Sequence, residues 1–586
     1  MTQPTTRTSA ADRSAARAAA AAPDASGAFT HRQILTILSG LMLGMFLAAL
    51  DQTVVSTAIR TIADDLQGYD LQAWATTAFL ITSTIATPLY GKLSDIYGRR
   101  GFYLFAIAVF VIGSALCGIA DSMYELAAFR ALQGIGAGGL MSLALAIIAD
   151  IVPPRERSKY QGYFMAVWGT SSVLGPVIGG FLAGQDSILG IDGWRWIFWI
   201  NVPLGIVAIA VVMRVLHLPH QRRDHRIDWP GALALVVALV PLLIVAEQGR
   251  IWGWSSGRAV LCYVVGAVGL VAFVLAERAY KDDAILPLRM FANRTFSVSA
   301  VSSIVLGAGM FGGILLLPQY LQVVHGSSPT VAGLQMLPLV LGIMTGAMGS
   351  GLTIARTGKY KVFPLVGVVF IVVALASLSF VVEADTSVWT LVPFMVLLGL
   401  GLGFNMQPVI LAVQNAVSPR EIGVATSSVT FFRQMGGTIG TAAFLSIMFS
   451  RLGTEIPEQI RAAAQASPEA AQQAAALQQA GAESVLADTT AIDAFPALVM
   501  PFRVGFSNTL DLVFLVAAAV VAVGFFVLWF LPQLELRTQS GIQAAAAEAP
   551  GAVPAADERT QEEQVAHAAG AGAPTSTAPP AGKPRD

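Results

Sequence analysis

The chain has 586 residues, of which 12% are charged and 55% are hydrophobic. Soluble proteins usually carry about 25% charged residues, so this composition excludes a string of water-soluble domains. The formal net charge is -1, from 35 basic and 36 acidic residues, which leaves no overall field to attract nucleic acid. Because the apolar residues lie in long blocks, the sequence predicts a polytopic membrane protein.

Apolar blocks of about 20 residues predict an all-α fold with fourteen transmembrane helices, arranged as six, two and six. The predicted spans are 34–59, 73–90, 101–120, 124–150, 160–184 and 194–214, then 230–248 and 258–277, and finally 297–321, 330–355, 362–382, 388–416, 422–449 and 508–531.

These spans divide the chain into a first six-helix half at 34–218, two inserted helices with linkers at 219–296, and a second six-helix half at 297–531. Residues 1–33 and 532–586 are rich in small and polar residues and poor in large apolar ones. That composition predicts disordered cytosolic tails, and deletion of residues 540–586 is expected to leave transport intact.

The positions of basic residues predict the orientation. The connections after even-numbered spans carry most of the loop Lys and Arg, whereas the short connections after odd-numbered spans carry only Arg60, Arg195, Arg250 and Arg258. Since positively charged loops stay in the cytoplasm, both tails are expected there. The segment 451–507 then lies outside and is too polar to insert. It is either a solvent-exposed cap or a lid for substrate access.

The loops after the second and tenth spans share a pattern. Residues 91–100 read Gly-Lys-Leu-Ser-Asp-Ile-Tyr-Gly-Arg-Arg, and residues 351–361 read Gly-Leu-Thr-Ile-Ala-Arg-Thr-Gly-Lys-Tyr-Lys. Each occupies the second loop of a six-span block. The pattern predicts two related halves, and transporters built from such repeats place their substrate between them. Two unrelated basic turns are the alternative.

Further motifs follow the predicted spans in order. They are Asp51 and Thr53 in the first span, Arg130, Gln133, Gly134 and Gly136 in the fourth, Gly175, Pro176, Gly179 and Gly180 in the fifth, Trp194, Arg195 and Asn201 around the start of the sixth, and Phe432, Arg433, Gly436 and Gly437 in the thirteenth. With these motifs and the 91–100 loop, the chain resembles the major facilitator superfamily, and within it the fourteen-span drug:proton antiporters of the EmrB/QacA type. The resemblance covers roughly residues 34–531. Two positions depart from the family pattern: Ile96 stands where an arginine is usual, and Ser56 where an asparagine is usual.

The resemblance implies a proton-coupled multidrug efflux antiporter that exports lipophilic or monocationic compounds by alternating access. It implies a bacterial inner membrane location with both termini cytoplasmic, and a role in drug resistance. Its partners would be protons, a small-molecule substrate and the lipid bilayer, with no ATP, no nucleic acid and no cofactor beyond the proton gradient. Neither a nucleophile with its base nor paired carboxylates indicate an enzyme. The alternative is an exporter of an endogenous lipid or secondary metabolite.

Two opposite charges lie deep in predicted spans. A charge near the bilayer centre costs at least about 2.5 to 3.5 kcal/mol, so it needs a partner, water or a function. Asp51 precedes the outer end of the first span and Arg130 follows the outer end of the fourth by similar numbers of residues, which places both about 13 Å below that surface. At this matching depth the two side chains could meet within the first half. Asp51 is the predicted proton carrier, Arg130 its modulator and Gln133 a hydrogen-bonding neighbour; a purely structural ion pair is the alternative.

In the family, the loop after the second span is a gate latch that stabilises the outward-facing form, a role that carries over to Gly91, Asp95, Gly98 and Arg99. Fixing the topology is the alternative role. The family's antiporter motif corresponds to Gly175, Pro176, Gly179 and Gly180, although a helix kink would use the same residues. The glycines from Gly134 to Gly139 imitate a dinucleotide loop, but they lie within a membrane helix and predict close packing.

Polar and aromatic residues of both halves are candidates for substrate contact. They are Tyr163, Trp168, Met310, Phe311, Gln335, Phe404, Asn405 and Gln407. Ordinary helix packing is the alternative for each. No acid lies in the middle of the tenth span, which favours neutral or singly charged cationic substrates. Arg433 has no acidic neighbour in its own span and is left between a structural and a transport role. His217, His220 and His225 lie among arginines, which disfavours a metal site.

Overall fold

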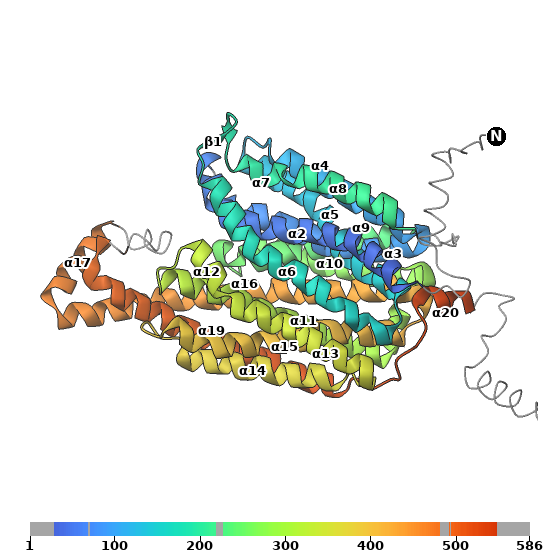
Figure 1. Ribbon diagram of the computed structural model, residues 1–586. Helices are drawn as coiled ribbons and strands as arrows, with labels where there is room; N and C mark the ends of the chain where they lie inside the picture. Colours follow the sequence, from blue (N-terminus) through green and yellow to red (C-terminus); the bar gives the residue numbers. More distant parts are fainter. Residues whose placement is uncertain (1–28, 68–70, 218–226, 481–491, 493, 548–586) are drawn as a thin grey trace, which may run out of the picture.

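Long helices lie side by side in the computed structural model, which describes residues 29–67, 71–217, 227–480, 492 and 494–547 (Figure 1). The first six are α2 (His31–Asp65), α3 (Gln72–Tyr97), α4 (Arg99–Cys117), α5 (Met123–Ile151), α6 (Pro154–Ala183), and the pair α7 (Arg195–Trp199) and α8 (Asn201–Val215). A two-stranded hairpin of β1 (Ser187–Ile188) and β2 (Ile191–Asp192) precedes α7.

The inserted pair is α9 (Trp229–Trp252) and α10 (Gly257–Tyr280), followed by the short η2 (Lys281–Asp283) and η3 (Leu288–Ala292). The second half contains α11 (Arg294–Val323), α12 (Pro329–Gln335) with α13 (Leu337–Thr357), α14 (Val362–Val381), α15 (Val388–Ala416), η4 (Pro419–Glu421), α16 (Ile422–Ala466) and α19 (Pro496–Trp529). Each predicted span coincides with one of these segments.

Among the described residues, 11 helices are long and apolar enough to cross a membrane. The remaining three predicted spans coincide with α3, α11 and α16, which are long helices inside the same bundle. The chain is therefore a multi-pass integral membrane protein. In the segment predicted as an outer connection, α16 continues to Ala466 and α17 (Pro468–Ala480) follows, and α17 projects beyond one end of the bundle (Figure 1).

The two halves share one packing pattern. In the first half, α3 and α4 pack against α5, α2 packs against α6 and α8, and α4 packs against α8. In the second half, the helices at the same positions make the same pairs: α13 and α14 against α15, α11 against α16 and α19, and α14 against α19. The contacts between the halves are also equivalent, α3 with α16 and α6 with α13. The repeat expected from the two loops is thus a repeat of the whole six-helix arrangement.

Glycines permit the closest helix contacts. A Cβ atom added at Gly136 would lie 2.5 Å from the Phe110 backbone nitrogen on α4, and one at Gly139 would lie 2.8 Å from the Ala106 Cβ. On the other face of α5, Gly134 and Gly138 meet α3. The predicted packing role of these glycines is therefore observed, because only a residue without a side chain lets α5 lie between α3 and α4 at this distance.

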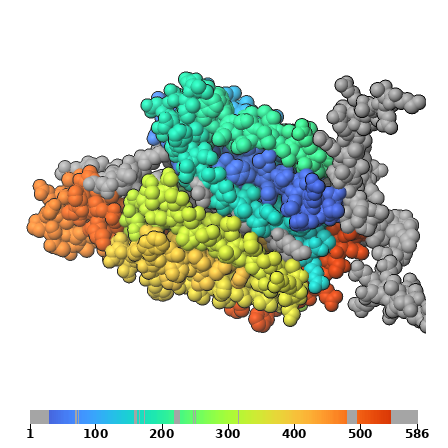
Figure 2. All heavy atoms as spheres, in the orientation of Figure 1, coloured from blue at the N-terminus to red at the C-terminus, as the bar shows by residue number. Residues whose placement is uncertain are grey.

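The inserted helices lie at the side of the bundle. Helix α9 contacts α3 of the first half and α16 of the second. Among the described long helices, α10 packs extensively against α9 alone. In the space-filling view, the first half in blue and teal lies above the second half in yellow, with the α16–α17 region projecting (Figure 2). The core of each half is thus built mainly from its own six helices, with the insertion as a lateral support.

The chain after α19 differs from the predicted tail. Residues up to Ala547 are placed: Tyr360 accepts from the Leu534 N–H and donates to the Pro532 carbonyl, and Asn415 bonds the backbone of Glu535 and Arg537. Helix α20 (Gly541–Ala547) then reaches the first half, where Ile542 packs against its core. Specific side-chain partners for the backbone thus order a segment whose own composition is poor in large apolar residues. Residues 548–586, like 1–28, lie outside the described part.

Candidate functional site: a buried ion pair and a gate latch

Asp51 and Arg130 form a buried ion pair between α2 and α5, as their predicted depths require. Arg130 Nη1 lies 2.5 Å from Asp51 Oδ2, and the two residues are each 1% exposed. Gln133 donates from Nε2 to Asp51 Oδ1 at 2.8 Å and accepts from Arg130 Nη1 at 2.7 Å. The three predicted residues therefore form one closed cluster, in which each bonds the other two.

Asn201 is a fourth member that the sequence reasoning did not assign. It opens α8, and its Nδ2 donates to Asp51 Oδ1 at 2.9 Å and to Ser114 Oγ at 3.0 Å. Ser114 in turn donates to the Phe198 carbonyl. A buried asparagine at the start of an apolar helix was the available signal, because such a residue needs a hydrogen-bonding partner. Four helices thus position the cluster: α2, α4, α5 and α8.

The remaining surroundings of Arg130 come from α3. Arg130 Nε donates to the Ala75 carbonyl at 3.1 Å, and the guanidinium carbon lies 4.1 Å from the centre of the Phe79 ring. A cation over an aromatic face is stabilised by the ring's electron density. Arg130 therefore keeps two contacts that do not depend on Asp51.

A second cluster lies at the opposite end of the helices, on the surface that also carries the loop 358–361 and the segment 532–547, here called the terminal face. Arg99 forms ion pairs with Asp95 and with Asp150, the latter at 2.8 Å, and donates to Ser94 Oγ at 2.6 Å. Burial raises the pKa of Asp95 to about 6, although Arg99 opposes this shift. Asp150, which the sequence left unassigned, completes this latch.

The latch joins the two halves through the backbone of α16. Asp95 Oδ2 accepts from the Val424 N–H at 2.9 Å, at the first turn of that helix, where unpaired N–H groups favour an anion. Gly91 faces Ser427 and Gly423, and a Cβ on Gly423 would collide with Asp95 and Arg99. Gly98 adopts a φ of 100°, which favours glycine. These contacts bind the two halves to each other at the terminal face.

Another contact across the halves lies beside the latch. Arg157, 2% exposed, donates to the carbonyls of Ala149 and Val152 at the end of α5 and to Gln414 Oε1 on α15. Gln414 Nε2 donates to Thr426 Oγ1 at 2.8 Å. A buried arginine of the first half therefore depends on a neutral side chain of the second, a contact that the sequence did not reveal.

The glycines of the antiporter motif lie where α6 passes between α2 and α12. A Cβ on Gly179 would lie 2.7 Å from the Val54 carbonyl oxygen of α2, and Gly175 abuts Thr53 of the same helix. On the other side, Pro176 lies against Gly333 and Gly180 faces Thr330. In the second half, Gly436 abuts Ile304 of α11, and the Gly437 backbone faces Gly307. Both halves thus use glycines at the equivalent crossing.

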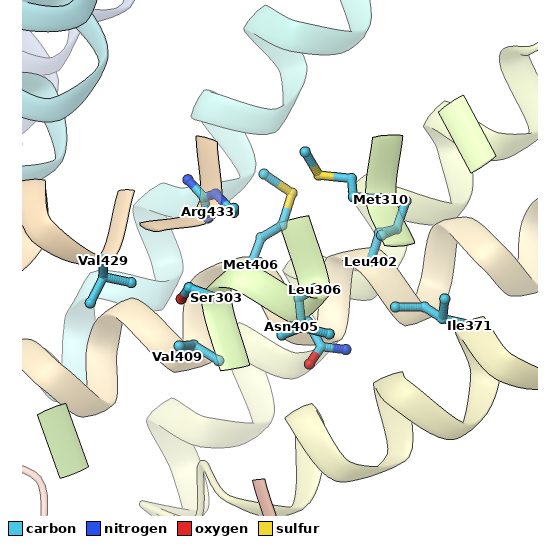
Figure 3. A pocket seen from close by; sticks show the side chains of 10 residues that line it. All are labelled: Ser303, Leu306, Met310, Ile371, Leu402, Asn405, Met406, Val409, Val429 and Arg433. Carbon is cyan, nitrogen blue, oxygen red and sulfur yellow. The ribbon is translucent and has the colours of Figure 1, made fainter. Parts of the chain in front are cut away.

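The substrate-contact candidates separate into several places. Met310, Asn405 and Arg433 line one pocket in the second half (Figure 3). Gln335 lines a different cavity near His325 and Trp389. Phe404 stacks against Phe363 and Phe370 of α14, Trp168 borders the core of the first half, Tyr163 is 44% exposed and Gln407 is buried on α15. The Phe311 side chain lies outside the described part.

One further ionisable residue, Glu277, has a local partner. Glu277 accepts two hydrogen bonds from the Leu286 N–H. Among the described residues, no group of three or more His, Cys, Asp or Glu could hold a metal ion. His217 is described, whereas His220 and His225 fall in the range 218–226 outside it.

Residues 41–441 match the Major Facilitator Superfamily. The chain belongs to this family of membrane transporters. It is 37% identical to multidrug resistance protein 3 of Bacillus subtilis, over 70% of this chain and 78% of that protein. It is 36% identical to the multidrug transporter protein MdtP of the same species, over 72% of this chain and 77% of that protein. An uncharacterized MFS-type transporter of Mycobacterium tuberculosis is 36% identical over 85% of this chain and 70% of its own length.

Solved structures share the fold at much lower identity. The proton:xylose symporter XylE superposes with a TM-score of 0.55 and 16% identity, covering 88% of this chain and 99% of XylE. A bacterial homologue of the lysosomal transporter Spinster gives 0.54 and 18% identity, covering 86% of this chain and 98% of its own. The family resemblance drawn from the motifs is therefore confirmed by the matched sequence, and the all-α transporter fold by these neighbours.

Proposed function

We propose that this transporter is a proton-coupled antiporter that exports lipophilic small molecules. The observation that carries the proposal is the cluster of Asp51, Arg130, Gln133 and Asn201, a carboxylate with three donors and 1% exposure. The relatives named as multidrug transporters support export of drugs as the direction and class of transport. Export of an endogenous lipid or secondary metabolite is the second candidate.

The cluster couples protonation to helix position through hydrogen bonding. Three donors from α5 and α8 point at the Asp51 oxygens, an arrangement that favours the ionised carboxylate. A proton on Asp51 would remove the negative charge and occupy one acceptor position with a donor, which would weaken these contacts. Because the cluster is closed to solvent, the proton reaches Asp51 only when the helices move. Proton uptake and the change of access would therefore occur together.

The orientation that we propose places the terminal face in the cytoplasm of a bacterial inner membrane, with both termini on that side. The excess of Lys and Arg in its loops supports this assignment. The latch of Asp95, Arg99 and Asp150 then closes the cytoplasmic end in the conformation described, as the family role of this loop implies. The proton enters from the outside and is released inside.

Uphill efflux from proteoliposomes under an imposed pH gradient tests the proposal. Asp51→Asn replaces the carboxylate by an amide of the same shape. Because the amide cannot bind and release a proton, this variant should abolish efflux driven by the gradient. Substrate counterflow, which needs only alternating access, should persist. The matched control is Asp64→Asn, an exposed carboxylate on the same helix, which should leave both activities unchanged. Undiminished uphill efflux by Asp51→Asn would reject Asp51 as the proton carrier.

The membrane voltage separates substrate classes. If one proton enters while one monovalent cation leaves, no net charge moves and voltage has no effect. With a neutral substrate the same exchange moves one positive charge inward and gains about 2.3 kcal/mol per 100 mV. Efflux measured at several clamped potentials therefore reports the charge of what is carried.

A further inference from the structure

Arg433 is a positively charged residue inside the helix bundle, and it has no counter-ion among the described residues. It lies on α16 within the second half, partly exposed, and no described residue forms a hydrogen bond, ion pair or aromatic contact with its guanidinium. The helices that line its pocket supply no acid nearby: α11, α14 and α15 contain no Asp or Glu, and α16 has none before Glu455. A charge inside a membrane helix bundle is costly without a partner. Because Arg433 forms no ion pair with a described residue, a structural ion pair does not account for an arginine at this position.

The pocket that Arg433 lines combines this charge with apolar surface (Figure 3). Leu306 and Met310 come from α11, Ile371 from α14, and Met406 and Val409 from α15. Methionine side chains are flexible and polarizable, and they line sites that accept varied apolar shapes. A molecule that fits here is therefore apolar over most of its surface and has one polar end at Arg433.

Two further polar groups line the pocket. Asn405 is 3% exposed and lines the pocket, and its Oδ1 accepts no hydrogen bond from the described residues, while Nδ2 donates to the Gly401 carbonyl. Ser303, on the facing helix α11, lines the same pocket at 3% exposure. A buried acceptor without a donor costs free energy until a ligand satisfies it. The ligand should therefore offer an anion to Arg433 and, at a separate position, a hydroxyl or N–H to Asn405.

We infer that this pocket receives the acidic end of a lipophilic organic anion that also carries a hydrogen-bond donor. The inference rests on the proposed export function and narrows its substrate class: it replaces the singly charged cations expected from the sequence, which Arg433 repels. Exchange of one proton for one such anion moves two positive charges inward per cycle, so efflux accelerates strongly with membrane voltage.

The pocket is nearly closed in this conformation. Its volume of about 20 Å³ is enough for about one water molecule, so an organic anion enters only when the surrounding helices separate. Because α16 also carries Val424 of the latch, opening of the terminal face moves a helix that lines the pocket. Substrate access from that face and release of the latch are thus motions of the same helix.

Binding to the full-length transporter in lipid nanodiscs tests the inference without a proton gradient. The probes are hydroxynaphthoic acid, naphthoic acid, naphthamide and naphthylmethylamine, which share one ring system and differ in charge and donor. The expected order of affinity is the hydroxy acid, the acid, then the amide, with the cation weakest. Arg433→Gln should weaken the acids by roughly 10- to 100-fold, as expected for a lost charge-assisted hydrogen bond, and leave the amide unchanged.

Controls separate recognition from stability. Arg451→Gln makes the same substitution on the same helix at a surface ion pair with Glu455, and should leave all four affinities unchanged. Arg433→Lys should retain the preference for acids in part, and Asn405→Leu should remove only the advantage of the hydroxy acid. Since Arg433→Gln deletes an unpaired charge, its melting temperature should not fall.

Equal wild-type affinity for the cation and the acids would overturn the inference, as would unchanged acid affinity in Arg433→Gln. The proposed function fails separately, through uphill efflux by Asp51→Asn, because the binding assay involves no proton movement. Acid binding that depends on Arg433 in a protein without proton-driven efflux would therefore retain the pocket assignment alone.

Discussion

Replacement of Gln414 by leucine is expected to open the terminal face. Gln414 supplies the only side-chain acceptor that Arg157 has among the described residues, and both are nearly inaccessible, at 3% and 2% exposure. In Gln414→Leu the closed state leaves a guanidinium N–H without a partner, whereas in the open state water satisfies it. Thr426 loses a donor but still donates to the Ile422 carbonyl, so the deficit falls on Arg157.

The magnitude follows from the charge on Arg157. A hydrogen bond to a charged group contributes roughly 1.5 to 3 kcal/mol, so the ratio of closed to open molecules should fall by roughly 10- to 150-fold. Gln414→Glu is the matched opposite change: it offers a carboxylate to the same guanidinium and should stabilise the closed state. Leucine and glutamate are similar in size, so opposite shifts of the closed-to-open ratio in the two variants would report the hydrogen bond to Arg157 and not a change in packing.

The assay is the rate of maleimide modification at Ser427→Cys, a position on α16 that faces Gly91 and is 1% exposed when the face is closed. The rate should rise in Gln414→Leu and fall in Gln414→Glu. Protein without the introduced cysteine gives the background from Cys117 and Cys262. Identical rates in the two variants, or a slower rate in Gln414→Leu, would refute the assignment of this contact as a closing interaction.

Three other outcomes are expected. Gly113→Ala places a Cβ 2.6 Å from the Gln133 backbone and should lower thermal stability in detergent by several degrees. The control Gly101→Ala, on the same helix, meets nothing within 4 Å and should be neutral. Equal stability of the two variants would contradict the packing argument. Asn201→Leu removes one donor to a carboxylate, a loss of roughly 1.5 to 3 kcal/mol, and should shift the pH dependence of efflux without abolishing counterflow. Deletion of 548–586 should leave efflux unchanged. Deletion of 540–586, which the sequence alone predicted to be silent, also removes α20, which contacts α5 of the first half and η4 of the second. This longer deletion should increase the rate of maleimide labelling at Ser427→Cys.

Several properties follow from the sequence alone because their causes are local. Hydropathy over a window of one span predicts a membrane helix regardless of its neighbours, and the predicted spans coincide with helical segments throughout. Depth along a helix is also local, so Asp51 and Arg130 could be placed at the same level before any contact was known. The glycines of α5 were assigned to packing because no other role suits such residues inside a membrane helix.

Contacts between distant segments depend on how helices rotate and pack, and the sequence does not encode these in any short window. Asn201 reaches Asp51 only because α8 packs beside α2, and the partner of Asp95 is a backbone N–H, a group that every residue except proline possesses. The tertiary structure likewise decided that Gln335 and Asn405 belong to different cavities and that Arg433 has no counter-ion among the described residues. Composition predicted a tail after α19, but Tyr360 and Asn415 supply partners to its backbone from elsewhere in the chain. Local chemistry thus determined which groups require partners, and packing decided which partners they have.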